Sequence, residues 1–294
     1  MRNFLNTPIE QMDFVSFDIE TTGFLANDVI TTFTVADGET YNAWVNTNGA
    51  ECDASSTIED IRETTGLSVS IQFASSEEEL LSSVHDFIRA SYSSDSTVFV
   101  AYNGERWKGG FDIPFIRTRC VLHNLPFPLK GYSYTDAQEV FGDKGRFNTT
   151  TTVDGVFIDD LRRSDLVDFA TFAGVSANGN MDEIAARFPD DPSAEIDGFD
   201  GSLKEAFTEW CDERSMERPT HTYRDLCGVH SVLVGGEAGS YDPFTDSVEA
   251  VEAYEKENFQ SILLHNIADV ERTNDLADLM VKYTPKYEFR PTVL

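Results

Sequence analysis

Positive charge is scarce in this chain. Its 294 residues include 22 Lys and Arg against 52 Asp and Glu, which gives a formal net charge of −30 and a pI near 4.3. Such an excess of acids normally counts against a polyanionic partner. Acidic blocks such as Glu77-Glu78-Glu79 and Asp190-Asp191 are spread along the chain, which indicates a solvated acidic surface and not one acidic tail.

Cysteines and long apolar runs are also few. Cys52, Cys120, Cys211 and Cys227 lie far apart, with no CxxC pair and no Cys/His cluster of zinc spacing, so we expect reduced thiols in a cytoplasmic protein. No segment approaches the roughly 20 apolar residues of a membrane span. The N-terminal MRNFLNTPIE lacks the apolar part of a signal peptide. Without a GxSxG motif or a setting for a catalytic Cys, we expect no covalent nucleophile.

An acidic surface of this kind is typical of proteins that work in molar salt. The composition resembles that of haloarchaeal proteins, or of proteins from viruses of haloarchaea. In molar salt the Debye length is about 3 Å, so overall repulsion hardly opposes nucleic-acid binding. Counterion release also contributes little there. Binding would then depend on local Arg contacts, base stacking and metal ions.

The most informative segment is DFVSFDIETTGF, residues 13–24. Its apolar residues predict a strand that ends at Thr21-Thr22-Gly23. Asp18 and Glu20 are two residues apart, so their carboxylates project from one face of that strand. Two neighbouring acids on a buried strand are tolerated mainly where a cation neutralises them, and hard oxygen ligands suit Mg²⁺ or Mn²⁺. The alternative is an Asp/Glu pair on a solvated strand face.

Two later segments carry acids of the same kind. In residues 101–120, AYNGERWKGGFDIPFIRTRC, a helix opens near Asp112, for which an ordinary N-cap is the alternative. In residues 263–276, LLHNIADVERTNDL, His265 and Asp269 share one helical face. The alternatives there are a capping or paired His and a surface Asp.

The second segment also carries cations. Arg106, Trp107 and Lys108 form a loop suited to phosphate contact and base stacking, or else an ordinary exposed loop. Arg117 and Arg119 follow on the helix and are candidates for contacts with backbone phosphates.

The periodicity of the chain predicts an α/β fold. We expect a mixed five-stranded sheet flanked by helices, with its first three strands antiparallel and the others parallel. Residues 1–294 are expected to form a single domain. Residues 137–240 are expected to be an insertion or an irregular helical region, and residues 285–294 a C-terminal tail. The expected strands are 14–20, 29–36, 41–47, 97–103 and 131–136, and the expected helices are 77–91, 113–123, 203–215, 223–234, 247–257 and 258–283.

Together, FDIETTGF, then NG…FDIPF, then a late helix with His four residues before Asp form an ordered pattern. The pattern resembles the DEDD (DnaQ-like) 3′–5′ exonuclease superfamily, which has the ribonuclease H-like fold. It is most similar to the proofreading exonuclease of family B DNA polymerases and to the stand-alone archaeal proteins related to it. The resemblance covers roughly residues 12–136 and 240–280. The first motif is quite specific, and the third is weaker alone.

The resemblance implies a role for each matching residue. Asp18, Glu20, Asp112 and Asp269 would hold two Mg²⁺ or Mn²⁺ ions as catalytic residues, and His265 would orient or deprotonate the attacking water. One branch of the superfamily has Tyr at this spacing and another has His one residue earlier, so the role of His265 as the base stays open. The residues that would bind the terminal nucleotide are Thr21, Thr22, Gly23, Phe24, Asn103 and Phe111, to which the longer loop adds Trp107.

The expected activity is hydrolysis of phosphodiester bonds at the 3′ end of single-stranded DNA, with release of nucleoside monophosphates. The partner would be nucleic acid and not a membrane, with replication or repair proteins as further candidates. RNA is the nearest alternative substrate. A nucleic-acid-binding protein with weak or no catalysis, and a metal-dependent phosphohydrolase that acts on nucleotides, are also left open.

Overall fold

The computed structural model describes residues 12–104, 111–143, 146–152, 168, 171, 209–210, 220–236, 238–244, 247–285 and 292–294. Its contacts divide the chain into two compact units, one of Met1–Phe147 with Arg224–Leu294 and one of Asn148–Tyr223. Trp107, Arg106 and Lys108 lie outside the described residues, as does most of the helix expected at 203–215.

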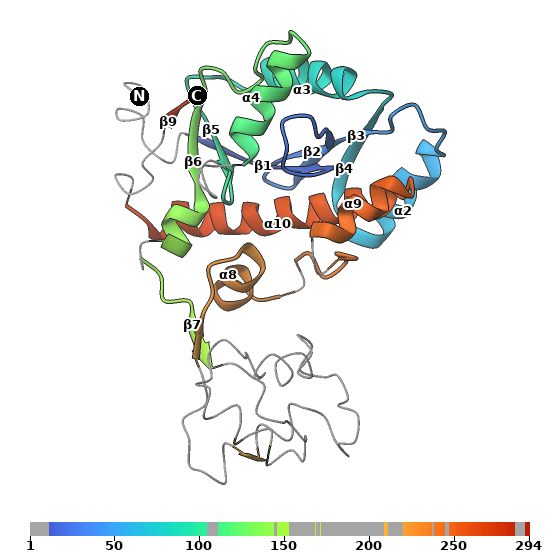
Figure 1. Cartoon of the computed structure of the whole chain (residues 1–294). Helices are drawn as coiled ribbons and strands as arrows, with labels where there is room; N and C mark the ends of the chain where they lie inside the picture. The colour runs from blue at the N-terminus through green and yellow to red at the C-terminus, as the bar shows by residue number, and fades with distance from the viewer. Residues whose placement is uncertain are drawn as a thin grey trace. The chain divides into compact units, whose positions relative to one another are not determined.

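A mixed seven-stranded sheet forms the centre of the first unit (Figure 1). The strand order is β4-β3-β2-β1-β5-β6-β9. The first three strands pair antiparallel, and β1, β5 and β6 pair parallel, as expected. The α/β class is confirmed, but the expected count of five strands is wrong. The strands are β1 (Asp13–Thr21), β2 (Ile30–Asp37), β3 (Thr40–Asn46), β4 (Ser68–Ala74), β5 (Thr97–Ala101), β6 (Ser133–Asp136) and β9 (Thr292–Val293).

The two additional strands lie at the edges of the sheet. β4 pairs parallel with β3, and its sequence SVSIQFA mixes polar and apolar residues, so its apolar signal is weak. β9 pairs antiparallel with β6 inside the segment 285–294, for which a tail was expected. A helix, α2 (Ala54–Thr65), was also missed because it has only one buried residue, Ile61.

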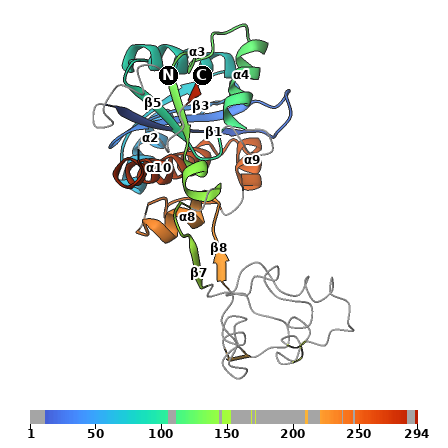
Figure 2. The same ribbon diagram turned by 90° about the vertical axis from the view of Figure 1, so that its left-hand side faces the viewer.

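Helices cover both faces of this sheet (Figures 1 and 2). α3 (Glu77–Ser91) and α4 (Asp112–Leu122) lie on one face, and α10 (Phe259–Tyr283) runs along the other. The expected cap of α3 is present, because Ser76 accepts a hydrogen bond from the Glu79 N–H at 3.2 Å. The described part of this unit also contains the π-helix η3 (Glu139–Asp143), α8 (Leu226–Leu233) and α9 (Ser247–Glu255).

The alternation of β1 decides which residues face each layer. Phe17 and Ile19 point into the core cluster that contains Leu80 of α3 and Ile113 of α4. Asp18 and Glu20 therefore face α10. The side chain of Asn266, on α10, donates a hydrogen bond to Asp18. The pairing register of β1 and β2 shifts directly after Glu20, at the end of this alternation.

The second unit contains a short two-stranded sheet. β7 (Thr150–Thr152) pairs antiparallel with β8 (Thr220–Thr222). Trp210 is buried, and its indole N–H donates a hydrogen bond to Asp168 at 3.2 Å. In neither unit do the described residues include a helix with both the length and the apolar character needed to cross a membrane.

Candidate metal centre

The four acids of the three motifs meet at one cavity of about 610 Å³ in the first unit. Asp18 and Glu20 come from β1, Asp112 from the first residue of α4, and Asp269 from the middle of α10. All four line the cavity. Three elements that are distant in the sequence thus bring four carboxylates to one place.

The two acids of β1 differ in their partners. Asp18 accepts a hydrogen bond from the side-chain amide of Asn266 at 2.7 Å. Burial and the neighbouring charges of Asp112 and Glu20 nevertheless raise its pKa well above the ordinary range. Burial raises the pKa of Glu20 to about 7, although the charge of His265 opposes this shift.

Asp112 is turned inward and is 6% exposed. The N-cap position of α4 belongs to Phe111 and carries no side-chain hydrogen bond, so the alternative of Asp112 as a helix cap is wrong. Burial and the charges of Asp136 and Glu20 raise the pKa of Asp112 well above its usual value. A Cβ on Gly104 would lie 3.2 Å from the Asp112 carboxylate and 2.8 Å from the Tyr134 hydroxyl, so the NG step leaves room for this acid.

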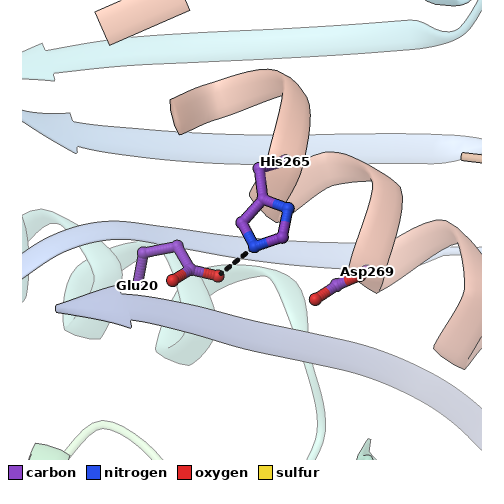
Figure 3. A group of neighbouring side chains, drawn as sticks. All are labelled: Glu20, His265 and Asp269. Carbon is purple, nitrogen blue, oxygen red and sulfur yellow. Dashed lines mark ion pairs between the residues drawn. The ribbon is translucent and has the colours of Figure 1, made fainter. Parts of the chain in front are cut away.

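His265 and Asp269 lie next to Glu20, as Figure 3 shows. One ligand atom from each of the three residues lies within 4.8 Å of the other two. The His265 Nε2 atom is 3.6 Å from Glu20 Oε1. Burial lowers the pKa of His265, but the hydrogen bond that its Nδ1 donates to Asp242 and the charge of Glu20 outweigh burial and raise the pKa to about 9.

Two residues that the motifs did not indicate support this group. Asp242 Oδ1 lies 2.8 Å from His265 Nδ1, and Arg272 Nη1 lies 2.8 Å from Asp242 Oδ2 and 2.7 Å from Asp269 Oδ1. Burial opposes ionisation of Asp242, but His265 and Arg272 outweigh it and lower its pKa. The position of Arg272, three residues after Asp269, was a signal in the sequence. Nothing in the sequence pointed to Asp242.

The expected nucleotide-binding residues mostly surround the same cavity. Phe24 is 67% exposed and meets Phe111 edge-on, with ring centroids 5.2 Å apart. Thr22 is not among the residues that line the cavity. Its hydroxyl accepts a hydrogen bond from the Val29 N–H at 3.0 Å, which stabilises the turn. Trp107 cannot be placed, since it lies outside the described residues. The lining residues from the expected set are Thr21, Gly23, Phe24, Asn103 and Phe111.

The two arginines of α4 differ in their surroundings, and Arg117 is the exposed one. Arg119 is buried and donates to the carboxylate of Glu77, so its expected phosphate contact is wrong. Arg117 packs over the ring of Phe127. Arg224, which the motifs did not indicate, is an exposed cation that lines the cavity.

The donor set fits a divalent cation. Asp18, Glu20 and Asp112 accept no hydrogen bond from Arg or Lys among the described residues, while burial and mutual repulsion disfavour their charged forms. A hard cation would relieve this repulsion and would suit oxygen ligands. Comparison of the chain with protein-family models and with curated protein sequences gives no match.

Proposed function

We propose that this protein is a divalent-metal-dependent 3′–5′ exonuclease with a ribonuclease H-like fold, acting on single-stranded DNA. The observation that carries the proposal is the convergence of Asp18, Glu20, Asp112 and Asp269 on one cavity from β1, α4 and α10. These acids would hold two Mg²⁺ or Mn²⁺ ions. Such ions supply an activated water, neutralise the scissile phosphate and stabilise the leaving 3′-oxygen.

The walls of the cavity suit a nucleotide at a chain end. Its volume of about 610 Å³ is in the range of small-ligand sites. Phe24 and Phe111 offer aromatic surface on which bases stack with little sequence preference. Arg224 offers a cation to a phosphate group. The site thus combines acids at the reacting bond with an apolar wall for the base and a cation for the backbone.

Local contacts position the turn that carries Phe24. The Thr21 hydroxyl donates to the Gly23 carbonyl at 2.8 Å, and Arg119 donates to the Ala26 carbonyl at 2.9 Å. Elsewhere in the lining, the Asn103 N–H donates to Asp136 at 2.9 Å. These contacts orient both sides of the cavity before a substrate arrives, which reduces the cost of binding.

A single assay tests the proposal against its alternatives. The protein is incubated in high KCl with Mg²⁺ or Mn²⁺ and with labelled single-stranded DNA, labelled RNA or free nucleotides. We expect a 5′-labelled DNA strand to shorten stepwise and to release nucleoside monophosphates. Asp112→Asn should lower the rate on the order of 10³-fold, because one of the four preorganised charges is lost.

The alternative outcomes are distinct. Degradation of RNA alone would change the substrate, and turnover of free nucleotides alone would indicate a phosphohydrolase. Retarded mobility of DNA without products would indicate a binding protein. Full activity of Asp112→Asn would refute the metal assignment.

A further inference from the structure

The His265 ring points toward Glu20, with Asp269 beside it (Figure 3). His265 is only 7% exposed. Glu20 and Asp269 line the cavity, and His265 lies next to them. A general base must lie within hydrogen-bonding reach of the proton it removes. An imidazole directed at two carboxylates that line the cavity is well placed to share a metal ion with them.

One of the two ring nitrogens of His265, Nδ1, already has a hydrogen-bond partner. Nδ1 of His265 lies 2.8 Å from Asp242 Oδ1, and Arg272 and the Phe244 N–H hold that carboxylate at 2.8 and 3.1 Å. An ionised carboxylate can only accept, so Nδ1 carries the proton of this hydrogen bond. A carboxylate that orients one ring nitrogen while the other turns to a metal is the usual support of a metal-bound histidine.

The second nitrogen, Nε2, forms no hydrogen bond with the described residues and has a long ion pair with Glu20, so a metal ion that bound there would displace its proton. Its nearest carboxylate oxygen, on Glu20, is 3.6 Å away, which is beyond hydrogen-bonding distance. Ligand atoms about 2.0–2.2 Å from one ion lie at most about 4.4 Å from each other. The spacing within 4.8 Å among Glu20, His265 and Asp269 would have to shorten only slightly around an ion.

We propose that Nε2 of His265 is a metal ligand, which together with Glu20 and Asp269 makes a mixed nitrogen and oxygen site. The proposal rests on the proposed function only in that both use the same carboxylates. Imidazole suits Zn²⁺ and other transition metals better than Mg²⁺, which prefers oxygen ligands. This site should therefore bind Mn²⁺ or Zn²⁺ more tightly than Mg²⁺, and the oxygen-only position formed with Asp18 and Asp112 should discriminate less.

The test is electron spin-echo spectroscopy of Mn²⁺ bound to the full chain, because it detects nitrogen-14 directly bonded to the ion. We expect a nitrogen-14 coupling in the native protein that disappears in His265→Gln. Calorimetric titration should show about 10-fold or more weaker Mn²⁺ binding in that variant, with a smaller change for Mg²⁺. His85→Gln is the control, since His85 lies on α3, on the other face of the sheet from α10, and its ring pairs with the neighbouring Asp86.

A second variant keeps the test decisive if His265→Gln does not fold. Asp242→Asn can donate to Nδ1, which places the ring proton on Nε2 and blocks it as a ligand. We expect this variant to lose the coupling and to bind Mn²⁺ about 10–100-fold more weakly. An imidazole that acts only as a base would leave the coupling absent in the native protein and Mn²⁺ affinity unchanged in both variants, and this result would overturn the proposal.

The readouts separate this inference from the proposed function. A nitrogen coupling without cleavage of any nucleic acid would support the ligand assignment and remove the nuclease proposal. Cleavage without a coupling that depends on His265 would do the reverse. No binding of Mn²⁺ at all would overturn the ligand assignment.

Discussion

Two buried groups in the first unit are built from the same residue types and reach opposite electrostatic results. In one, Glu77 accepts hydrogen bonds from the Ile30 N–H at 2.7 Å, from Arg119 Nε at 2.8 Å and has His123 Nε2 at 2.6 Å. Its carboxylate is fully partnered. In the candidate metal centre, the acids outnumber the donors that reach them among the described residues. The same chemistry therefore stabilises the fold in one place and leaves a demand for a cation in the other.

The difference lies in how many acids share one cation. Glu77 faces the guanidinium of Arg119 directly. In the candidate metal centre, Arg272 pairs with both Asp242 and Asp269. Asp18 has only the neutral amide of Asn266 among the described residues. A buried acid is thus a candidate functional residue when its neighbours fail to balance it, and burial alone does not make it one.

Removing one acid from each group should change the free energy of unfolding very differently. This is the largest effect we expect. Glu77→Gln leaves Arg119 buried without an ionised partner and should lower the free energy of unfolding by about 3–5 kcal/mol. Asp18→Asn removes a repelling charge and should cause no loss in the metal-free protein. Urea unfolding in high KCl with EDTA measures both. A comparable loss in the two variants would show that the groups do not differ in this way.

The stability of the metal-free protein should also depend on pH because of Glu20. Glu20 has a pKa raised from 4.5 to about 7, so the folded state holds its proton more tightly than the unfolded state. The stability that this proton contributes is complete below about pH 4.5 and is lost as the pH rises through 7, which amounts to about 3 kcal/mol. Urea unfolding at pH 4.5 and pH 8 should show a loss that is smaller in Glu20→Gln than in the native protein by about this amount, because the other raised acids remain. Saturating Mn²⁺ should reduce the loss, and parallel pH profiles would contradict the assignment.

The smallest effect we expect comes from crowding the guanidinium of Arg272, which supports the acid cluster. Gly239 has φ of +68°, and a Cβ there would lie 2.6 Å from the Arg272 guanidinium. Gly236 also has a positive φ, of +84°, but nothing lies within 4 Å of its Cβ position. Both substitutions by Ala strain the backbone, so Gly236→Ala is a matched control. Gly239→Ala should cost about 1 kcal/mol more and should also weaken Mn²⁺ binding. Equal effects of the two would exclude a role of Arg272 in the site.

The sequence pattern correctly predicted those parts of the fold that depend on neighbouring residues in the chain. The alternation of β1 and the Ser76 cap of α3 are both present, and they place Asp18 and Glu20 on one strand face. β4 and α2 were missed because few of their residues are buried. Arg119 was misjudged because its partner, Glu77, lies 42 residues away. Contacts of this kind depend on packing that no local pattern records.

The same limit applies to the candidate site. The acids could be named because each sits in a recognisable motif. Asp242 could not, because its contact with His265 spans 23 residues and depends on how the segment before α9 folds onto α10. Asn266 follows His265 directly, yet its partner Asp18 is 248 residues away. The supporting residues of a site are therefore harder to predict from sequence than its charged centre.

The strict alternation of β1 restricts how this protein can evolve. Shifting the strand by one residue would turn Asp18 and Glu20 into the apolar layer under α3 and α4, and would turn Phe17 and Ile19 toward α10. A single codon inserted or deleted upstream in this strand would thus damage the acid cluster and the packing of the sheet together. Descendants can exchange one aliphatic side chain for another here, but they have to conserve the length of the strand.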